Sequence, residues 1–337
     1  MHLDRSLVAL FCATTALISL SACAAGRSQV APATNPQIIV ERGSTATGTR
    51  LGLRIVDPAT IKAQIYVGQY GAPSDPGEVN DYNANNSKDK KEFCQVSDLT
   101  GVNAIAVDST GELWIPQQNA SGVNEVTSIA PDCGKAGTTL SDPNGQPNDI
   151  AFNSSGVRYV SDIVGNGSTA GDISVYPKGK TSPTSTLTDS AVFYSQGVAV
   201  DSHGNVYQAF VNQAVTKGGI LEFAAGKMPG KIIKDIKITV PGVPILDKSD
   251  DIIVTDDATT AVNIYAPPYN KAPKTFPLKG TTSQCSLNKA ETNIACADRG
   301  NDSIDIYSYP AGKYSYSFSN GLGASPLLTI GIAQDPI

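Results

Sequence analysis

The chain contains two histidines, His2 and His203, and their positions limit the chemistry that imidazole groups could perform. His2 lies in a segment with the features of a cleaved export signal, which leaves one histidine for a Ser-His-Asp triad or a multi-histidine metal site. His203 stands inside Asp201-Ser-His-Gly204, a run typical of an exposed turn, and we expect it to be solvated. The sequence also lacks the Gly-x-Ser-x-Gly, His-Glu-x-x-His and Gly-x-x-x-x-Gly-Lys motifs.

Amide side chains at matching positions of a repeated segment are the stronger candidates for ligand binding. Asn103, Asn148 and Gln196 occupy the same position in three consecutive copies, where the other copies have Gly242, Ser283 and Ile330. Amides gathered at one side of a channel can coordinate a hard cation such as Ca²⁺ or Mg²⁺, or bind a polar ligand. They can equally bond to one another, to the backbone and to ordered water. We predict a ligand-binding rim at these amides with no obligate cofactor; Asn103 and Asn148 would hold a cation if one binds.

Several aspartates follow or flank the strands near the same rim: Asp149, Asp162, Asp256, Asp257 and Asp298. One of them could supply the carboxylate that a hydrolase would need. Strand ends and turns commonly carry aspartates that face water, and we expect this solvated role for all of them.

The repeat itself is a hairpin in which an apolar strand, a turn opened by Asp or Asn and closed by Gly, and a second strand follow one another. Its turn residues recur at intervals of about 41 to 48 residues, a period that suits a four-stranded propeller blade. They are Asp108, Asn153, Asp201, Asp247, Asn288 and Asp335.

A second column of short alternating strands follows the hairpins and tests the repeat independently. Its members are Val123–Val126, Ile173–Tyr176, Ile220–Phe223, Val262–Tyr265, Ile304–Tyr307 and Val79–Tyr82. The last of these lacks a first strand, whereas the C-terminal copy, Gly331–Asp335, lacks the other three. We therefore predict an all-β, six-bladed β-propeller with four strands per blade, closed by pairing the C-terminal strand with three strands from residues 61–98.

The N-terminus resembles a bacterial lipoprotein signal, because an uncharged run ends in Leu20-Ser21-Ala22-Cys23. We predict a signal peptide over residues 1–22, lipidation at Cys23 with acyl chains such as palmitate, a flexible tether to residue 60 and the propeller over 61–337. An ordinary cleaved signal is the alternative. Ala24 follows the cysteine where Asp would favour the inner membrane, so we expect anchoring at the outer membrane.

Apart from Cys12 in the signal and Cys23 at the anchor, the chain has four cysteines, an even number as expected for an oxidising compartment. Three pairings are possible, and we favour Cys285–Cys296, on the two strands of one hairpin, with Cys94–Cys133, on outer strands of consecutive blades. A zinc site is the alternative, although none of these spacings forms a Cys-x-x-Cys pair.

Charged residues make up 17% of the chain, with a net charge of −6 and no basic cluster that would neutralise a phosphate backbone. We expect no nucleic-acid partner and a monomeric domain. The membrane, through the lipid anchor, and an envelope protein or glycan are the expected partners.

Pro147-Asn-Asp-Ile-Ala-Phe152, followed by Ser155-Gly-Val-Arg-Tyr-Val160, resembles the repeat of NHL propellers and of gluconolactonase-type propellers. The gluconolactonase resemblance implies a divalent cation held by a Glu, two Asn and an Asp at the channel mouth. Asn148 matches one of the family's asparagines. Gln196 replaces the essential Asp, and no Glu is evident at the start of a first strand.

These departures favour a non-catalytic binding module for a protein, a glycan or a small polar ligand. The alternative is a metal-dependent lactone or ester hydrolase that uses Asn103, Asn148 and a substitute carboxylate. A structural envelope component without a small ligand is a third possibility.

Overall fold

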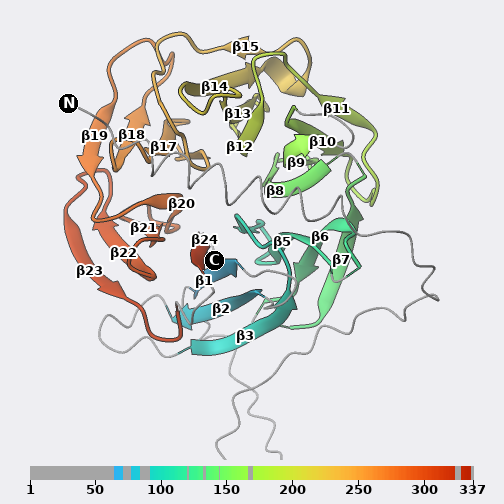
Figure 1. The fold of residues 1–337 in the computed structure, drawn as a ribbon, viewed down its shortest axis with the longest axis vertical. Helices are drawn as coiled ribbons and strands as arrows, with labels where there is room; N and C mark the ends of the chain where they lie inside the picture. Colours follow the sequence, from blue (N-terminus) through green and yellow to red (C-terminus); the bar gives the residue numbers. More distant parts are fainter. Residues whose placement is uncertain are drawn as a thin grey trace, which may run out of the picture. The chain divides into compact units, whose positions relative to one another are not determined.

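The protein is a six-bladed β-propeller built from six four-stranded antiparallel sheets arranged in a ring (Figure 1). The computed structural model describes residues 64–70, 77–83, 92–119, 121–131, 134–143, 145–165, 170–322 and 328–334. The predicted signal peptide, Cys23 and the whole tether lie outside these residues. None of the helices in the described ranges is long and apolar enough to cross a membrane.

The first three blades combine both ends of the chain with its first half. Blade 1 consists of β24 (Leu328–Gln334), β1 (Gln64–Tyr70), β2 (Gly77–Asn83) and β3 (Glu92–Leu99). Blade 2 consists of β4 (Ala106–Val107), β5 (Leu113–Gln118), β6 (Asn124–Ile129) and β7 (Ala136–Ser141). Blade 3 consists of β8 (Gly145–Phe152), β9 (Arg158–Gly165), β10 (Asp172–Tyr176) and β11 (Ser185–Leu187).

The other three blades follow in chain order, each from its innermost to its outermost strand. Blade 4 consists of β12 (Tyr194–Val200), β13 (Val206–Val211), β14 (Gly218–Phe223) and β15 (Lys231–Ile232). Blade 5 consists of β16 (Ile245–Leu246), β17 (Ile252–Asp256), β18 (Ala261–Tyr265) and β19 (Lys274–Pro277). Blade 6 consists of β20 (Thr282–Leu287), β21 (Asn293–Asp298), β22 (Ser303–Ser308) and β23 (Tyr314–Phe318).

Each predicted hairpin turn in the described residues is closed by the side chain of its Asp or Asn. In blade 2, Asp108 Oδ1 accepts the main-chain N–H groups of Thr110 and Glu112, and Asn153 accepts from the equivalent positions in blade 3. Such side-chain bonds stabilise a turn without contacts to distant residues. The positions of these turns could therefore be predicted from the sequence. The copy at Asp335 lies outside the described residues.

The ring closes as predicted, by pairing β24 with β1. The register places Tyr66 opposite Ala333 and Val67 opposite Ile332. Gly331 is required here because a Cβ atom on it would lie 2.5 Å from the main-chain oxygen of Asn103, on the neighbouring blade. The two ends of the propeller thereby share one sheet, which removes the open edges of a linear array.

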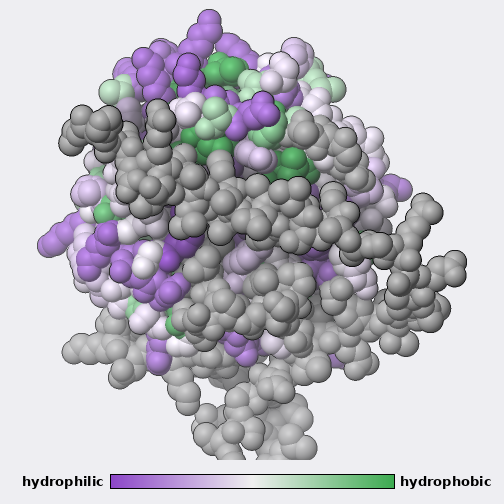
Figure 2. Space-filling model, in the orientation of Figure 1, coloured by the Kyte–Doolittle hydropathy of each residue, from purple (hydrophilic) through white to green (hydrophobic). Residues whose placement is uncertain are grey.

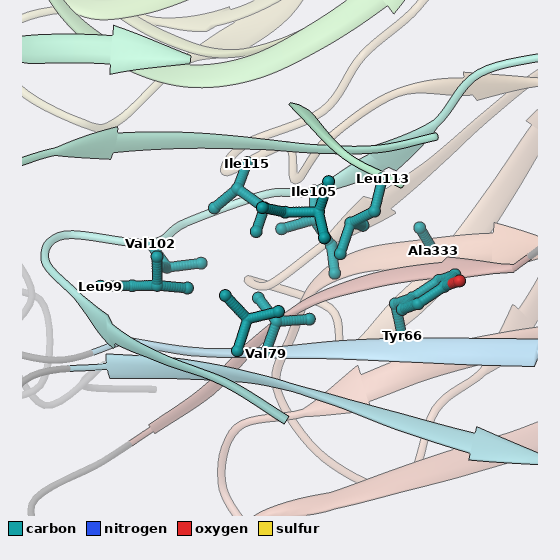
Figure 3. Close-up of a cluster of buried hydrophobic side chains, with 10 residues drawn as sticks. Tyr66, Val79, Leu99, Val102, Ile105, Leu113, Ile115 and Ala333 are labelled. Atoms are coloured by element: carbon teal, nitrogen blue, oxygen red, sulfur yellow. The ribbon is translucent and has the colours of Figure 1, made fainter. Parts of the chain in front are cut away.

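Each seam between adjacent blades contains its own cluster of buried apolar side chains. Between blades 1 and 2, Tyr66 and Val79 face Ile105 and Ile115 (Figure 3). Each fully buried aliphatic side chain of this kind contributes roughly 1.5–3 kcal/mol. The core is therefore divided among the seams, so the geometry of each seam depends on the strands at either side.

The predicted disulfide between Cys285 and Cys296 is present and joins directly paired residues of β20 and β21. Both cysteines are buried within the seam between blades 5 and 6. The other predicted pair, Cys94–Cys133, falls outside the described side chains and stays a prediction.

Candidate functional site

The predicted amide rim lies where the inner strands of blades 2, 3 and 4 meet. The Asn148 amide, which is 8% exposed, donates to the main-chain oxygen of Gln196 at 2.8 Å, and the Asn148 main-chain oxygen accepts from Ala104 N–H. The half-buried Asn103 side chain donates to the Gly101 oxygen at 3.3 Å. The structure thus brings Asn148 and Gln196 into contact, and the donor of Asn148 is used within the ring.

A further amide, Gln284 on β20, was not singled out from the sequence. Its side chain donates to the Ile105 oxygen at 2.9 Å and accepts from the N–H groups of Ile105 and Ile332. One buried side chain therefore connects blade 6 to the inner strands of blades 1 and 2. In the sequence, Gln284 differs from the rim amides only in lying inside the first strand of its blade and not at the start of that strand.

The expectation that the aspartates are solvated is wrong for most of them. Asp149, Asp162, Asp256 and Asp298 are between 0% and 5% exposed. Asp256 and Asp298 accept main-chain N–H groups of nearby loop residues, including Val240 and Gly300, which compensates for the loss of hydration.

Asp257 and Asp149 are held by different partners. Asp257 forms an ion pair with Arg299 at 2.7 Å. Asp149 accepts the N–H of Val198 on the next blade at 2.9 Å, and its burial raises its pKa to about 7. These carboxylates connect loops and neighbouring blades. Their burial depends on tertiary contacts, which the sequence pattern does not show.

Asp162 differs from its counterparts because it faces other carboxylates. The Ser174 hydroxyl lies 3.2 Å from both Asp142 and Asp162, and Asp172 adjoins Asp162 across the β9–β10 pair. Burial, reinforced by Asp142 and Asp172, raises the pKa of Asp162 well above its ordinary range, and burial also raises that of Asp172. This cluster gathers three carboxyl groups at the seam between blades 2 and 3.

The cation site implied by the gluconolactonase resemblance does not fit these residues. Asn148 is bonded to the main chain of Gln196, and Gln196 offers an amide where the family has a carboxylate. Within the ranges described, no group of three or more His, Cys, Asp or Glu side chains is arranged to hold a metal ion.

His203 is an exposed turn residue, as expected, with 75% of its side chain accessible. Ser202 Oγ lies 3.2 Å from His203 Nδ1, and Asp250 Oδ2 lies 3.5 Å from the same nitrogen. A catalytic relay needs the serine and the carboxylate on opposite ring nitrogens. This arrangement therefore does not form a triad.

A groove of about 660 Å³ lies between blades 4 and 5, a size suited to a ligand. We call it the blade 4/5 groove. Its floor is formed by Asn263 and Tyr265 of β18, and its sides carry Asp235 and Lys237 from blade 4 with Lys271 and Thr275 from blade 5.

Two donors of the groove floor, on largely buried residues, have no hydrogen-bond acceptor among the described residues. Asn263 is 8% exposed and accepts the Thr275 hydroxyl through Oδ1, while its Nδ2 has no acceptor. Tyr265 is 2% exposed, and its hydroxyl makes no hydrogen bond. Burial, and less so Asp256, raises the pKa of Tyr265 to about 12, so its hydroxyl stays protonated and able to donate.

Tyrosines at the same place in three other blades are all bonded to the preceding blade. Tyr82 donates to the Asn320 oxygen at 2.8 Å, and Tyr176 donates to the Ser141 oxygen at 2.9 Å. Tyr307 accepts the Lys279 N–H at 3.0 Å. Tyr265 is the exception in this column.

No protein-family model matches this chain, and no curated protein sequence matches it either. Solved structures do match. One chain of the nidogen/laminin complex is 15% identical, with a TM-score of 0.64 over 81% of this chain and 98% of that chain. A protein of unknown function from Bacteroides caccae is 11% identical, with a TM-score of 0.60 over 82% of this chain and 100% of that one. These likenesses show the fold, which hosts many functions.

Replacing Asp149 tests the buried carboxylate that links blades 3 and 4. Its folded pKa of about 7 exceeds its ordinary value of 3.8, so the folded state holds a proton that the unfolded state releases between those values. Stability is therefore full below about pH 4 and is lost as pH rises toward 7, by a few kcal/mol at about 1.4 kcal/mol per pKa unit. Asp149→Asn should flatten the fall in urea-unfolding free energy between pH 5 and pH 8. An equally steep fall in the variant would refute this assignment.

Two matched substitutions test the difference between the tyrosines. Tyr176→Phe removes a bond to Ser141 and should lower the free energy of unfolding by about 1–2 kcal/mol. Tyr265→Phe removes a hydroxyl without a partner and should change it by less than about 0.5 kcal/mol. Urea titration at pH 7 measures both, and equal losses would show that the Tyr265 hydroxyl is bonded.

Proposed function

We propose that this chain is a non-catalytic binding module of the bacterial cell envelope, with the blade 4/5 groove as its binding surface. The observation that carries this proposal is a pair of donors, Asn263 Nδ2 and Tyr265 Oη, on largely buried residues that line an open groove, with no acceptor among the described residues. Neither atom is among the fully buried polar atoms without a partner, so both donors are accessible from the groove. A ligand that supplies acceptors can form hydrogen bonds with both of them.

The contacts at the channel support the same choice over hydrolysis. Asn148 bonds to the Gln196 main chain, and Asp149 bonds to Val198. Moving the Asp149 carboxylate away from Val198 for catalysis would break a connection between blades 3 and 4. The matching chain of the nidogen/laminin complex comes from an assembly of proteins, which is consistent with a propeller acting in recognition.

The location forms part of the proposal. We propose that the repeat is of NHL type and that acyl chains on Cys23, directly after the lipobox-like run, anchor the chain at the outer membrane. The tether, to about residue 60, would present the ring to envelope proteins or glycans. Asn103, Asn148 and Gln196 remain a second candidate surface for a small polar ligand.

Site-specific photo-crosslinking in the producing cells tests the binding surface. A photoreactive residue at Asn270, an exposed position lining the groove, should crosslink the full chain to a discrete partner. The same residue at Ala290, an exposed turn position in blade 6, is the matched control and should give no such product.

Crosslinks at neither position, or equally at both, would contradict a partner at the groove. Turnover of a δ-lactone by the full chain that depends on Ca²⁺ or Mg²⁺ would contradict the non-catalytic assignment.

A further inference from the structure

The bonded tyrosines show what kind of partner the blade 4/5 groove lacks. In blade 1, Tyr82 donates to the main-chain oxygen of Asn320 and Asn80 donates to that of Gly321, both just beyond β23 of the preceding blade. In blade 3, Tyr176 donates to the main-chain oxygen of Ser141, the last residue of β7. In these two blades the acceptors are peptide carbonyl groups at or just beyond the end of the preceding outer strand, whereas in blade 6 the Tyr307 hydroxyl accepts the Lys279 N–H.

Blade 5 lacks these carbonyl groups because the outer strand of blade 4 is truncated. β15 spans two residues, Lys231–Ile232, whereas the outer strands β7 and β23 span six and five. After β15 the chain makes a turn, with the Ile236 N–H bonded to the Ile233 oxygen. The buried side chains of Ile236 and Ile238 pack in one apolar cluster with Tyr265, but no main-chain carbonyl group of this segment accepts a hydrogen bond from Tyr265 Oη or Asn263 Nδ2.

The floor of the groove follows β18, an extended strand of five residues. Asn263 and Tyr265 lie two positions apart on it and face the same side, which matches the side-chain spacing of a strand. A peptide lying along the floor in extended conformation would present carbonyl groups at a spacing similar to that between Asn263 and Tyr265. An extended peptide can thus replace the missing outer-strand contacts.

The charge around the groove indicates which peptide fits. Lys231, Lys234, Lys237, Lys271 and Lys274 are all exposed on the segments beside it, and none forms an ion pair with another described residue. Asp235 is the one exposed acid among the groove's lining residues. Figure 2 shows hydrophilic residues gathered along the outer edge of the ring over blades 4 to 6. This local excess of cations stands out in a chain with a net charge of −6.

We propose that the blade 4/5 groove binds an extended acidic peptide segment of a partner protein, whose carbonyl groups accept hydrogen bonds from Asn263 Nδ2 and Tyr265 Oη. This inference rests on the proposed function and adds the class of ligand. Acidic side chains of the segment pair with Lys237 and Lys271 at the two sides of the groove. The electrostatic part of binding weakens as salt increases.

Fluorescence anisotropy with labelled octapeptides tests the proposal on the purified full chain. The probe alternates Asp and Val, and two comparison peptides carry Lys or Asn in place of Asp. The Asp peptide should bind tightest and lose affinity with added salt. Tyr265→Phe should weaken it about 5-fold, the equivalent of one hydrogen bond, and the double variant Lys237→Glu, Lys271→Glu should weaken it at least about 10-fold.

Matched controls separate the groove from general effects. Tyr176→Phe removes a hydroxyl that is bonded inside the ring, and Lys289→Glu reverses an exposed charge on blade 6; both should leave affinity unchanged. Equal binding by the Tyr265→Phe variant, or a preference for the Lys peptide, would overturn the inference. If no octapeptide binds while the Asn270 crosslink persists, the peptide class is wrong and the binding surface stands. If the crosslink is also lost, both proposals fail.

Discussion

The antiparallel pairing of β24 with β1 is the contact on which the rest of the structure depends. It joins segments from opposite ends of the chain in one sheet and completes the blade that the other five need as a neighbour. Gln284 adds to this closure by bonding to Ile332 of β24 and Ile105 of blade 2. A closed ring keeps every seam between its blades. Where one blade has a shortened outer strand, the seam beside it is not filled and a groove remains.

The fold was predictable because its signals are local. The Asp or Asn that opens each described hairpin bonds to main-chain N–H groups two to five residues later, so the turn is specified within a short stretch. Cys285 and Cys296 are likewise paired by the register of a single hairpin. The split blade followed because the strand missing at one end of the chain was left over at the other.

The site was harder to predict because its properties depend on neighbouring blades. Asp149 reads as a strand-end acid, yet its carboxyl is buried against Val198 of the next blade. Tyr265 and Tyr176 look alike in sequence, and only the outer strand of the preceding blade distinguishes them. One signal was available: Pro229-Gly230, in the region expected for the outer strand of blade 4, is unfavourable for a long strand.

Residue-resolved hydrogen exchange on the segment after β15 tests most directly whether blade 4 lacks a full outer strand. The N–H groups of Lys234, Asp235 and Lys237 have no main-chain acceptor among the described residues, whereas the outer strands β7 and β23 are paired along their length. The structure predicts rapid exchange at these three amides and slow exchange at the hydrogen-bonded amides of β7 and β23. Slow exchange at Lys234, Asp235 and Lys237 would mean that β15 continues across the seam and fills the groove, which would contradict the account.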